Sequence, residues 1–548
     1  MNTRFIFVLG GVMSGVGKGT SVASIGAILK SKGFKVEAVK IDPYVNVDAG
    51  TMNPVEHGEV FVTKDGDETD QDIGNYERFL NQDITRENYM TTGRVYLSVI
   101  QRERNLEYKG RCVEVVPCVP EEVIRRLDYV AKKSKADFVI IEIGGTVGEY
   151  ENILFLEALR MMKLRAPRNV QSILVSYLPV PPSIGEMKTK PTQHAVREMN
   201  RVGIAPDFLI CRSQQPLDEP RREKLSRFCG VHPTHIITAE NAKSVYEVPG
   251  NFERQNLGNA LLKAFGVRPR PSRLEPWNML AHRLQTVKKE VKIGVVGKYF
   301  STGDFVLSDV YLSVLEAIKH AAWDQNRKPV IEWLNAEEYE KNPGSVRELK
   351  KYDGVLIPGG FGSRGVEGKI RAIQFIRENR IPYFGLCYGM QCAVIEFARN
   401  VLGLKSANTT EINPKTPHPV IHLMNGQDKN VQEKKMGGTL RLGSYPFVLK
   451  NGSVADRSYK TNKTYVLSER HRHRYEFNNA YRAELEAEGL IVSGESPDGM
   501  LAEIVEIPMH QFFVGVQFHP EFQSRPLFPH PLFRAFIKAA IKNSSLRA

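Results

Sequence analysis

A cysteine flanked by glycines is the first feature of this chain whose spacing suggests chemistry. In the segment Gly385-Leu-Cys387-Tyr-Gly389, small residues stand two positions before and two positions after the cysteine. This spacing is typical of a sharp strand-to-helix turn that exposes a nucleophile. The N-terminus of the following helix would favour the thiolate form of the sulfur. A lone cysteine is more often an inert core residue, so the pattern needs partners elsewhere in the chain.

A base and an acid that could orient it follow much later. The segment Gln517–Glu521 contains His519 and Glu521 at the end of an apolar run. If that run is a strand beside the one before Cys387, the three side chains form a Cys–His–Glu set for acyl transfer through a thioester. Gly359-Gly360 would supply backbone N–H groups for an oxyanion hole. The sequence therefore predicts three catalytic residues in one site.

A second candidate site lies near the N-terminus. Gly10–Thr20 is rich in glycine and stands between the first predicted strand and the first predicted helix. Such a loop turns backbone N–H groups toward phosphate oxygens, and Lys18 would reach the transferred phosphoryl group. The spacing departs from the standard Walker form, because five residues separate Gly11 from Gly17 and Gly19 follows the lysine. Taken alone, an ordinary glycine-rich turn remains the alternative.

Acidic and basic residues at strand ends could complete a nucleotide site. Asp72, and Glu142 at the end of an apolar run, are candidate Mg²⁺ ligands. Taken singly, a solvated acid or a helix cap explains either of them equally well. Lys40 ends another apolar run, at the ligand-binding edge of a parallel sheet. Lys188–Gln193 would add positive charge and hydroxyl groups, although such a run alone is usually part of the surface.

Parallel strands are needed to position these residues. Short apolar runs alternate with helix-period segments, of which Ser21–Lys32 is the first. The pattern predicts an α/β protein with two doubly wound domains, residues 1–266 and 291–542. Residues 267–290 form a linker, because Val267–Pro276 holds three prolines and four charges. The tail after Lys542 is expected to fray. The predicted strands are Phe5–Leu9, Val36–Ile41, Phe138–Ile143, Ile173–Ser176, Phe208–Cys211, Lys292–Lys298, Gly354–Gly360, Pro382–Cys387 and Phe512–Phe518.

The composition indicates a soluble globular protein. The chain has 548 residues, with 42% hydrophobic and 25% charged, which suits two domains of about 250 residues each. The first apolar run is too short for a signal peptide, and no run approaches the roughly 18 apolar residues of a membrane span. The six cysteines form no paired framework, so we expect a reduced, cytoplasmic setting and no membrane.

The net charge of +13 fits either a solvated surface or pockets for polyanions such as nucleoside triphosphates. Lysines and arginines are scattered and no nucleic-acid module is recognisable, so we do not expect nucleic-acid binding. Cys229, His232 and His235 are close enough to suggest a metal, but a second ligand pair is lacking. His471 and His473 lie on an extended segment, where contacts with an anion or a loop are favoured over a metal.

Dense sequence motifs connect these sites to one known family. Over about residues 2 to 540 the chain resembles the CTP synthases. No other family combines all of these motifs. They are Gly10–Gly19, Lys40–Asp48, His57–Thr63, Glu142–Gly148, Gly185–His194, Pro358–Gly362, Gly437–Gly443 and Arg470–Tyr475.

The resemblance implies an N-terminal P-loop amidoligase domain of the dethiobiotin-synthetase type and a C-terminal class I glutamine amidotransferase domain. It implies that ATP phosphorylates the 4-oxygen of UTP, and that ammonia released from glutamine at Cys387 displaces the phosphate to give CTP. Mg²⁺ is the implied cofactor, GTP the activator and CTP the feedback inhibitor. The family assembles as a homotetramer with pyrimidine pockets at the subunit interfaces, and it has a tendency to form filaments.

The resemblance also carries residue roles onto matching positions. It implies that Lys18 and Lys40 are catalytic, together with Cys387, His519 and Glu521. It also implies that Asp72 and Glu142 hold the metal. The ATP-binding residues are Gly15, Val16, Gly17, Lys18, Gly19, Thr20 and Asp72. The UTP- and CTP-binding residues are Ser14, Glu149, Tyr150, Glu151, Lys188, Thr189, Lys190, Pro191, Thr192, Gln193 and Lys224. The glutamine-binding residues are Gly360, Tyr388, Gly389, Met390, Gln391, Glu411 and Arg474.

Some positions depart from the family pattern. Val115–Pro120, which contains Cys118 and Pro120, replaces a Val-Ile-Pro-His-Ile-Thr segment of many relatives, and Glu114 replaces a glutamine. Lys109 replaces a common leucine, and Tyr299–Ser308 is longer than usual. These segments lie near the expected pyrimidine, GTP and ammonia-handling regions. We therefore expect the chemistry to persist and its regulation by CTP and GTP to differ.

Two other classes of protein share parts of this pattern. A cobyrinic-acid amide synthase joins related domains, but its substrate is a corrin carboxylate, and the pyrimidine segment Lys188–Gln193 argues against it. A partitioning-type ATPase or a filament scaffold would explain the phosphate loop. It would not need Cys387, His519 and Glu521.

Overall fold

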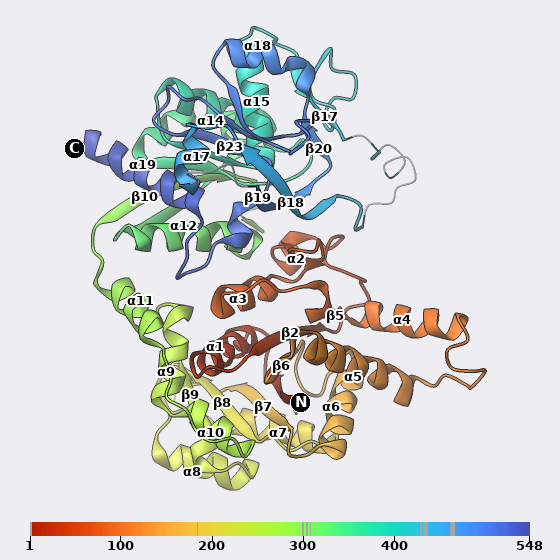
Figure 1. Ribbon diagram of the computed structural model, residues 1–548. Helices are drawn as coiled ribbons and strands as arrows, with labels where there is room; N and C mark the ends of the chain where they lie inside the picture. The colour runs from red at the N-terminus through yellow and green to blue at the C-terminus, as the bar shows by residue number, and fades with distance from the viewer. Residues whose placement is uncertain are drawn as a thin grey trace. The chain divides into compact units, whose positions relative to one another are not determined.

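The computed structural model describes residues 3–183, 185–298, 301–302, 305–306, 308–424, 426–427, 430, 437–460 and 466–547. The chain forms two compact units, shown in Figure 1. Unit 1 comprises Met1–Ala49 and Asp72–His282, and unit 2 comprises Gly50–Gln71 and Arg283–Ala548. Each unit is built on one large sheet with helices on its faces, which confirms the predicted α/β class. The segment Gly50–Gln71 belongs to unit 2, although the sequence places it inside the first domain.

The sheet of unit 1 has seven parallel strands in the order β5-β2-β6-β1-β7-β8-β9. The strands are β1 (Arg4–Gly11), β2 (Val36–Asp42), β5 (Tyr89–Thr91), β6 (Phe138–Ile143), β7 (Val170–Tyr177), β8 (Phe208–Ser213) and β9 (Ile236–Glu240). The helices are α1 (Lys18–Ser31), α3 (Gln71–Leu80), α4 (Thr92–Arg104), α5 (Val115–Ser134), α6 (Ile153–Arg165), α7 (Lys190–Arg201), α8 (Glu219–Cys229), α9 (Val248–Arg254), α10 (Leu257–Ala264) and α11 (Glu275–Thr286).

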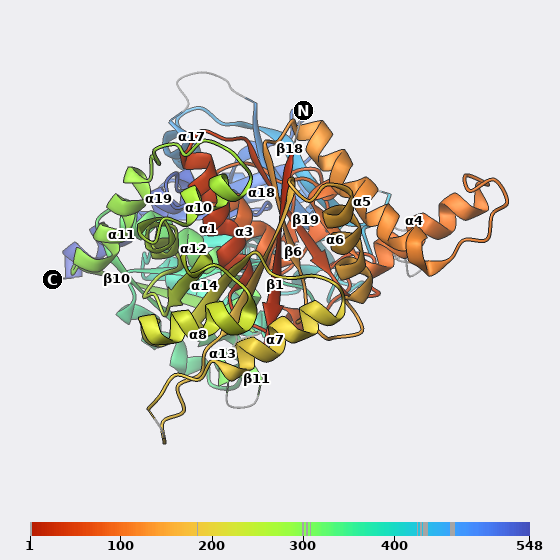
Figure 2. The same cartoon turned by 90° about the horizontal axis from the view of Figure 1, so that it is seen from below.

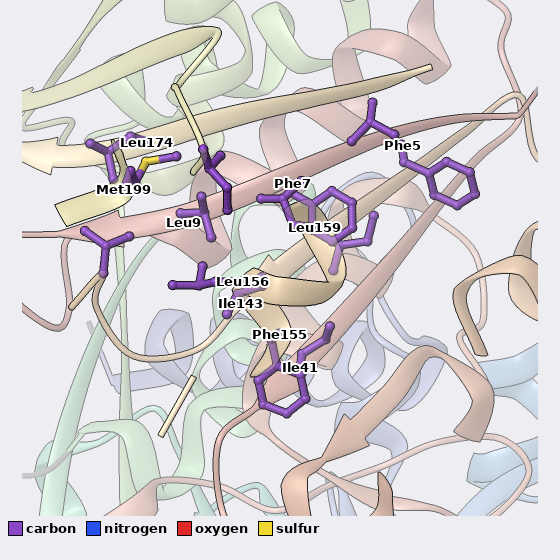
Figure 3. Close-up of a cluster of buried hydrophobic side chains, with 14 of the residues drawn as sticks. Phe5, Phe7, Leu9, Ile41, Ile143, Phe155, Leu156, Leu159, Leu174 and Met199 are labelled. Atoms are coloured by element: carbon purple, nitrogen blue, oxygen red, sulfur yellow. The ribbon is translucent and has the colours of Figure 1, made fainter. Parts of the chain in front are cut away.

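The central strands of unit 1 are buried on both faces, which explains their nearly continuous apolar sequences. Figure 3 shows part of the core, where Phe5, Phe7 and Leu9 of β1 lie among side chains of α6 such as Leu156 and Leu159. Burying one such side chain contributes about 1.5–3 kcal/mol. This packing holds the carboxyl ends of the strands in fixed register. In both Figure 1 and Figure 2, α4 and the chain after it extend away from this core.

The sheet of unit 2 has nine strands in the order β13-β10-β14-β15-β23-β22-β21-β18-β19, parallel from β13 to β23 and antiparallel beyond. These strands are β10 (Glu290–Gly297), β13 (Lys328–Asn335), β14 (Gly354–Ile357), β15 (Tyr383–Leu386), β18 (Arg441–Leu449), β19 (Leu467–His473), β21 (Ile491–Glu495), β22 (Ala502–Glu506) and β23 (Phe513–Val516). Shorter strands are β3 (Phe61–Val62), β4 (Glu68–Thr69), β11 (Ser301–Thr302), β12 (Phe305–Val306), β16 (Ala407–Thr409), β17 (His418–Leu423) and β20 (Tyr475–Phe477).

Helices cover both faces of this second sheet, with one buried apolar cluster on each side. Helices α12 and α19 pack together on one face, and α13, α14 and α15 on the other. The helices are α2 (Pro54–His57), α12 (Leu312–Asp324), α13 (Ala336–Lys341), α14 (Val366–Glu378), α15 (Tyr388–Asn400), α17 (Val454–Tyr459), α18 (Arg482–Ala487) and α19 (Pro531–Arg547).

The segment Gly50–Gln71 packs into unit 2 through polar and aromatic contacts. The Glu59 carboxylate accepts hydrogen bonds from the backbone N–H of Ser313, at 3.0 and 3.1 Å, and from its hydroxyl. The Phe61 ring lies 4.9 Å, centroid to centroid, from that of Phe522. Arg470 of β19 donates to the Val62 carbonyl oxygen at 3.1 Å. No periodicity in the sequence signals these long-range partners, so the sequence could not assign this segment to unit 2.

All nine predicted strands are present, with ends shifted by a few residues. The predicted frayed tail is wrong, because α19 continues to Arg547. Its end is held by Asn543, whose side chain donates to the Asp353 carbonyl oxygen at 3.0 Å, and by an ion pair between Arg547 and Asp353. Much of Tyr299–Ser308 lies outside the described residues. In the described part of the chain, no helix is both long enough and apolar enough to cross a membrane.

Candidate functional site

The turn at Cys387 is the centre of the candidate site in unit 2. Cys387 follows β15 and caps the N-terminus of α15, with φ 48° and ψ −99°. A positive φ is unusual for a residue with a side chain and is found where a nucleophile is held on a sharp turn. A Cβ at Gly385 would overlap the Tyr383 hydroxyl, and one at Gly389 would overlap the Ile357 carbonyl oxygen. The two glycines therefore permit the turn, as the sequence predicts.

His519 and Glu521 lie beside this turn because β15 and β23 are neighbours in register, with Leu386 opposite Val516. His519 Nδ1 lies 2.7 Å from Glu521 Oε1, and both side chains are buried. Burial alone would lower the pKa of His519. The Glu521 carboxylate and the Cys387 sulfur outweigh burial and raise that pKa to about 10. The histidine is therefore an imidazolium at neutral pH, bonded to the acid through Nδ1, while its buried Nε2 has no hydrogen-bond partner among the described residues.

The loop after β14 closes over the sulfur. An ideal Cβ at Gly359 would lie 2.9 Å from His519 Cε1 and 3.7 Å from Cys387 Cβ, so both catalytic candidates flank this glycine. The sulfur also lies 3.8 Å from the Arg472 carbonyl oxygen and 3.6 Å from Gln517 Nε2. Gln517 was not predicted, and its place just after β23 is the signal that could have found it.

The predicted glutamine-binding residues are only partly brought together. The backbone N–H of Gly362 donates to Glu411 Oε1 at 2.7 Å, and the Tyr388 hydroxyl donates to the Gly362 carbonyl oxygen at 2.8 Å. Glu411 and Tyr388 thus meet at the loop that contains Gly360. Gln391 Nε2 donates to the Tyr475 carbonyl oxygen at 2.9 Å.

Two further members of the glutamine set contact other residues of unit 2. Met390 is fully buried and packs against Gly515 of β23, where an ideal Cβ would lie 3.0 Å from Met390 Cβ. Arg474 donates to Thr439 Oγ1 at 2.8 Å and also bonds Gln427.

The phosphate loop of unit 1 joins β1 to α1. Gly15 and Gly17 have φ of 69° and 96°, which few other residues adopt without strain. Lys18 begins α1, and its buried Nζ donates to the Gly145 carbonyl oxygen at 2.8 Å. Burial lowers the pKa of Lys18, although Glu142 opposes the shift. A Cβ at Gly19 would overlap the Asp72 carboxylate. The departure from the Walker pattern at this position therefore makes room for an acid.

Lys40 is surrounded by carboxylates. Its Nζ lies 3.0 Å from Glu142 Oε1 and 3.6 Å from Asp42 Oδ1, and it also pairs with Asp72. Lys40 and Glu142 are register partners on β2 and β6, which explains their proximity. Burial raises the pKa of Glu142 and raises that of Asp42 to about 6, with Lys40 opposing both shifts. The Tyr76 hydroxyl donates to Glu142.

The sequence did not predict Asp42 or Tyr76 as members of this cluster. The position of Asp42 at the end of β2, two residues after Lys40, could have indicated it. The donor set fits Mg²⁺, because Asp72 and Glu142 offer hard carboxylate oxygens at one edge of the sheet. The cluster has three carboxyl groups, of Asp42, Asp72 and Glu142, and two lysines, Lys18 and Lys40. A divalent cation bound there would offset the repulsion among the three acids.

A small cavity lies next to the phosphate loop. It is lined by Val16, Gly17 and Thr20 on one side and by Arg212 and Glu240 on the other. Arg212 is the last residue but one of β8 and Glu240 ends β9, so both stand at the ligand-binding edge of the sheet. The sequence missed these two residues because neither belongs to a local motif. The cavity adjoins the phosphate loop, and it is a place where a nucleotide base could bind.

The predicted pyrimidine residues form two groups. Glu149 accepts hydrogen bonds from the Thr146 N–H at 2.9 Å and the Thr146 hydroxyl at 2.6 Å. Glu151 lines a separate pocket with Tyr96 and Val119, while Tyr150 is almost fully exposed. Ser14 is exposed on the phosphate loop.

The second group surrounds the start of α7. Thr189 caps the helix and accepts a hydrogen bond from Gln193 at 3.2 Å, and Thr192 bonds Ser176 of β7 at 2.8 Å. The remaining members, Lys188, Lys190 and Pro191, keep exposed or half-buried positions. Lys224 is exposed on α8. Arg221 of the same helix contacts this segment, donating to the Met187 carbonyl oxygen at 3.1 Å.

The other histidine and cysteine candidates have structural partners. His235 stacks on Phe208 with centroids 4.1 Å apart, and His232 caps a short 3-10 helix by accepting from the Thr234 N–H. This disfavours a metal at that position. His471 and His473 are buried inside unit 2. His471 Nδ1 lies 3.1 Å from His473 Nε2, and burial holds the pKa of both well below the usual value.

Comparison with known proteins agrees with this geometry. Residues 4–267 match the CTP synthase N-terminus model, and residues 306–539 match the class I glutamine amidotransferase model. A CTP synthase of Rippkaea orientalis is 49% identical over 544 residues, covering 99% of this chain and 97% of that protein. One from Carboxydothermus hydrogenoformans is 50% identical over 545 residues, covering 99% of this chain and all of that protein. One from Nostoc punctiforme is 50% identical over 540 residues, covering 98% of this chain and 97% of that protein. This chain therefore belongs to the CTP synthase family and is a glutamine-dependent carbon–nitrogen ligase.

Proposed function

We propose that this chain converts UTP to CTP with ATP and glutamine, in two linked reactions at separate sites. ATP phosphorylates the 4-oxygen of the uracil ring. Ammonia from glutamine then attacks carbon 4 and displaces phosphate, so that CTP, ADP, phosphate and glutamate are the products. The observation that carries this proposal is the presence in one chain of a buried Cys387–His519–Glu521 set and a lysine–carboxylate cluster beside a phosphate loop.

At the glutaminase site the Cys387 sulfur attacks the glutamine amide carbon and forms a thioester. His519, charged and held by Glu521, donates its proton to the leaving ammonia and later accepts one from the hydrolytic water. Gly359 and Gly360 provide the backbone that binds the developing oxyanion. Tyr388, Gly389, Met390, Gln391, Glu411 and Arg474 complete the glutamine site.

At the synthetase site Lys18 stabilises charge on the transferred phosphoryl group. Lys40 stabilises the same charge, and Asp42 belongs to the carboxylate cluster around Lys40. Asp72 and Glu142 would hold Mg²⁺, which supplies charge neutralisation to the triphosphate when bound. Gly15, Val16, Gly17, Gly19 and Thr20 bind ATP together with Arg212 and Glu240.

The pyrimidine nucleotide is bound by Ser14, Glu149–Glu151, Lys188–Gln193 and Lys224. CTP competes for this region as a feedback inhibitor, and GTP activates glutamine hydrolysis. The pyrimidine pocket is completed in a homotetramer, and tetramers can stack into filaments. The departures at Lys109 and Glu114–Pro120 alter the strength of both effectors. Residues 1–266 and 291–542 act as the two catalytic domains, joined by the linker 267–290, except that Gly50–Gln71 packs into the second unit.

Nitrogen transfer from amide-¹⁵N-glutamine tests this proposal. We expect the label in the 4-amino group of CTP with the unaltered chain. In Cys387→Ala, glutamine should no longer support CTP formation, whereas ammonium chloride should still do so, because the synthetase residues are untouched. Cys392→Ala, which removes a second buried cysteine of α15, is the matched control and should behave as the unaltered chain does. Glutamine-dependent CTP formation by Cys387→Ala would contradict the assignment of the nucleophile.

A further inference from the structure

Lys369 is a buried lysine that the catalytic roles above do not use. It lies in the first turn of α14 with no exposed surface. Among the described residues, its Nζ has no hydrogen-bond partner. Burying an ammonium group without a partner is costly, and native proteins rarely do it unless the group serves a function. The position of Nζ relative to the glutaminase site indicates what that function is.

The Nζ of Lys369 lies behind both backbone elements that surround the sulfur. It is 5.1 Å from the centroid of the Tyr388 ring, and Tyr388 directly follows Cys387. An ideal Cβ at Gly360 would lie 3.9 Å from the same Nζ. The preceding glycine, Gly359, flanks Cys387 and His519. The lysine therefore lies beside both the residue that follows the nucleophile and the glycine loop next to it.

The charged and titratable groups around Lys369 do not neutralise it. Lys298 at the end of β10 is also cationic, and its Nζ donates to the Phe361 carbonyl oxygen. Burial and then Lys369 lower the pKa of Lys298, to about 8. Glu411 bonds the Gly362 N–H and opposes that shift at Lys298.

Burial is the largest influence on Lys369 and lowers its pKa, and the groups that oppose this shift by favouring the charged form are two cysteines, Cys392 and Cys387. Burial raises the pKa of Cys392 to about 11, so Cys392 stays a neutral thiol at physiological pH. Cys387 is then the neighbour whose negative charge can offset a buried ammonium. Lysine charge and cysteine charge stabilise each other, since such a coupling is reciprocal.

We propose that Lys369 is an electrostatic positioning residue of the glutaminase site, whose ammonium group stabilises negative charge on Cys387 and on the oxyanion held by Gly359 and Gly360. The inference rests on the proposed function of Cys387. Lys369 transfers no proton and touches no substrate. It acts across Tyr388 and Gly360, in a low-dielectric region where a charge has a large effect.

The test uses the full-length chain with Lys369→Met and Lys369→Gln, which remove the charge, and Lys369→Arg, which keeps it. Lys405→Met, at an exposed lysine of the same unit, is the control. The first readout is the rate of Cys387 alkylation by iodoacetamide between pH 6 and 9, followed by mass spectrometry. The second is kcat and KM for glutamine hydrolysis. Circular dichroism and thermal melting check that each variant is folded.

We expect the neutral variants to lose about tenfold in alkylation rate at pH 7, because fewer Cys387 thiolates are present. Their alkylation profile should move to higher pH. The kcat for glutamine should fall at least tenfold with KM within threefold, and Lys369→Arg should recover most of both losses. Ammonia-dependent CTP formation should not change.

An alkylation profile identical to that of the unaltered chain in folded Lys369→Met or Lys369→Gln would overturn the inference. Equal losses in the arginine variant would also overturn it, because packing rather than charge would then be the cause. The same holds if both neutral variants unfold while Lys369→Arg stays folded, since the fold rather than the thiolate would then require the cation. If Cys387→Ala keeps glutamine-dependent activity, the proposed function itself fails, and this outcome is distinct from those three.

Discussion

The link between Glu521 and His519 leads to a quantitative prediction for Glu521→Gln. The substitution keeps the shape of the side chain but removes the charge 2.7 Å from His519 Nδ1. The carboxylate is the first of the groups that raise the pKa of this histidine to about 10 from its ordinary value of 6.5. Without that charge, burial lowers the pKa again. The imidazolium is then no longer the dominant species at neutral pH.

The size of the effect follows from the shift. A rise from 6.5 to about 10 corresponds to about 5 kcal/mol of preference for the imidazolium, at about 1.36 kcal/mol per unit. The Cys387 sulfur supplies part of that preference, so about 4 kcal/mol is a reasonable share for the carboxylate. Because each 1.36 kcal/mol is a factor of ten in rate, kcat for glutamine hydrolysis should fall on the order of 10³-fold.

The assay measures glutamate release and CTP formation on the same preparation. Ammonia-dependent CTP formation is the internal control and should stay within threefold, because the change lies in unit 2. Glu488→Gln makes the same change of charge at an exposed position and should have no effect on either rate. If Glu521→Gln keeps glutaminase kcat within tenfold of the unaltered chain, the electrostatic reasoning is refuted.

Further predictions concern stability and the synthetase site. Because the native pKa of His519 is raised, its contribution to stability is complete below about pH 6.5 and is lost as pH rises toward about 10; the melting temperature of unit 2 should fall over that range, and a flat profile would count against the ion pair. Glu59→Leu leaves the buried Ser313 N–H without its acceptor, so melting of unit 2 should occur about 2–8 °C lower, for a cost of about 1–3 kcal/mol. Gly66→Ala should destabilise the same unit by more than 1 kcal/mol, because φ is +84° and the new Cβ would lie 2.8 Å from the Leu442 carbonyl oxygen; an unchanged melting temperature would show that the turn relaxes. Lys40→Met should lower CTP formation with ammonia more than 10²-fold while glutaminase persists, and retained synthesis would exclude Lys40 from the phosphoryl-transfer site.

Much of this architecture could be predicted from local sequence. Apolar runs with helix-period segments between them located the strands, and the ends of β2 and β6 placed Lys40 and Glu142 side by side. The spacing around Cys387 predicted the turn, since only small residues fit where a Cβ would meet Tyr383 or Ile357. These features depend on neighbours in sequence or on strand register, which follow simple rules.

The remaining features depend on partners that are distant in sequence. Arg212 and Glu240 reach the phosphate loop only because β8 and β9 follow β7 in the sheet. Lys369 reads as an ordinary helix residue until packing buries it. His471 and His473 alternate along β19 like a solvent-facing strip, but both are buried. His471 faces Arg441 and Glu503, and His473 contacts His471. No single motif contains this information.

The placement of Gly50–Gln71 has a consequence for dividing the gene. A cut in the linker is the obvious way to produce the two units as separate polypeptides. A chain beginning at residue 283 would lack Glu59, Phe61 and Val62, and so would leave an apolar ring face and two polar groups of unit 2 uncovered. We expect such a fragment to be less stable and more prone to aggregate than unit 2 in the whole protein. Supplying residues 50–71 as a peptide should partly restore it. Splitting the gene of this enzyme would therefore require moving residues 50–71 to the polypeptide that contains unit 2. This constraint favours keeping both activities on one polypeptide.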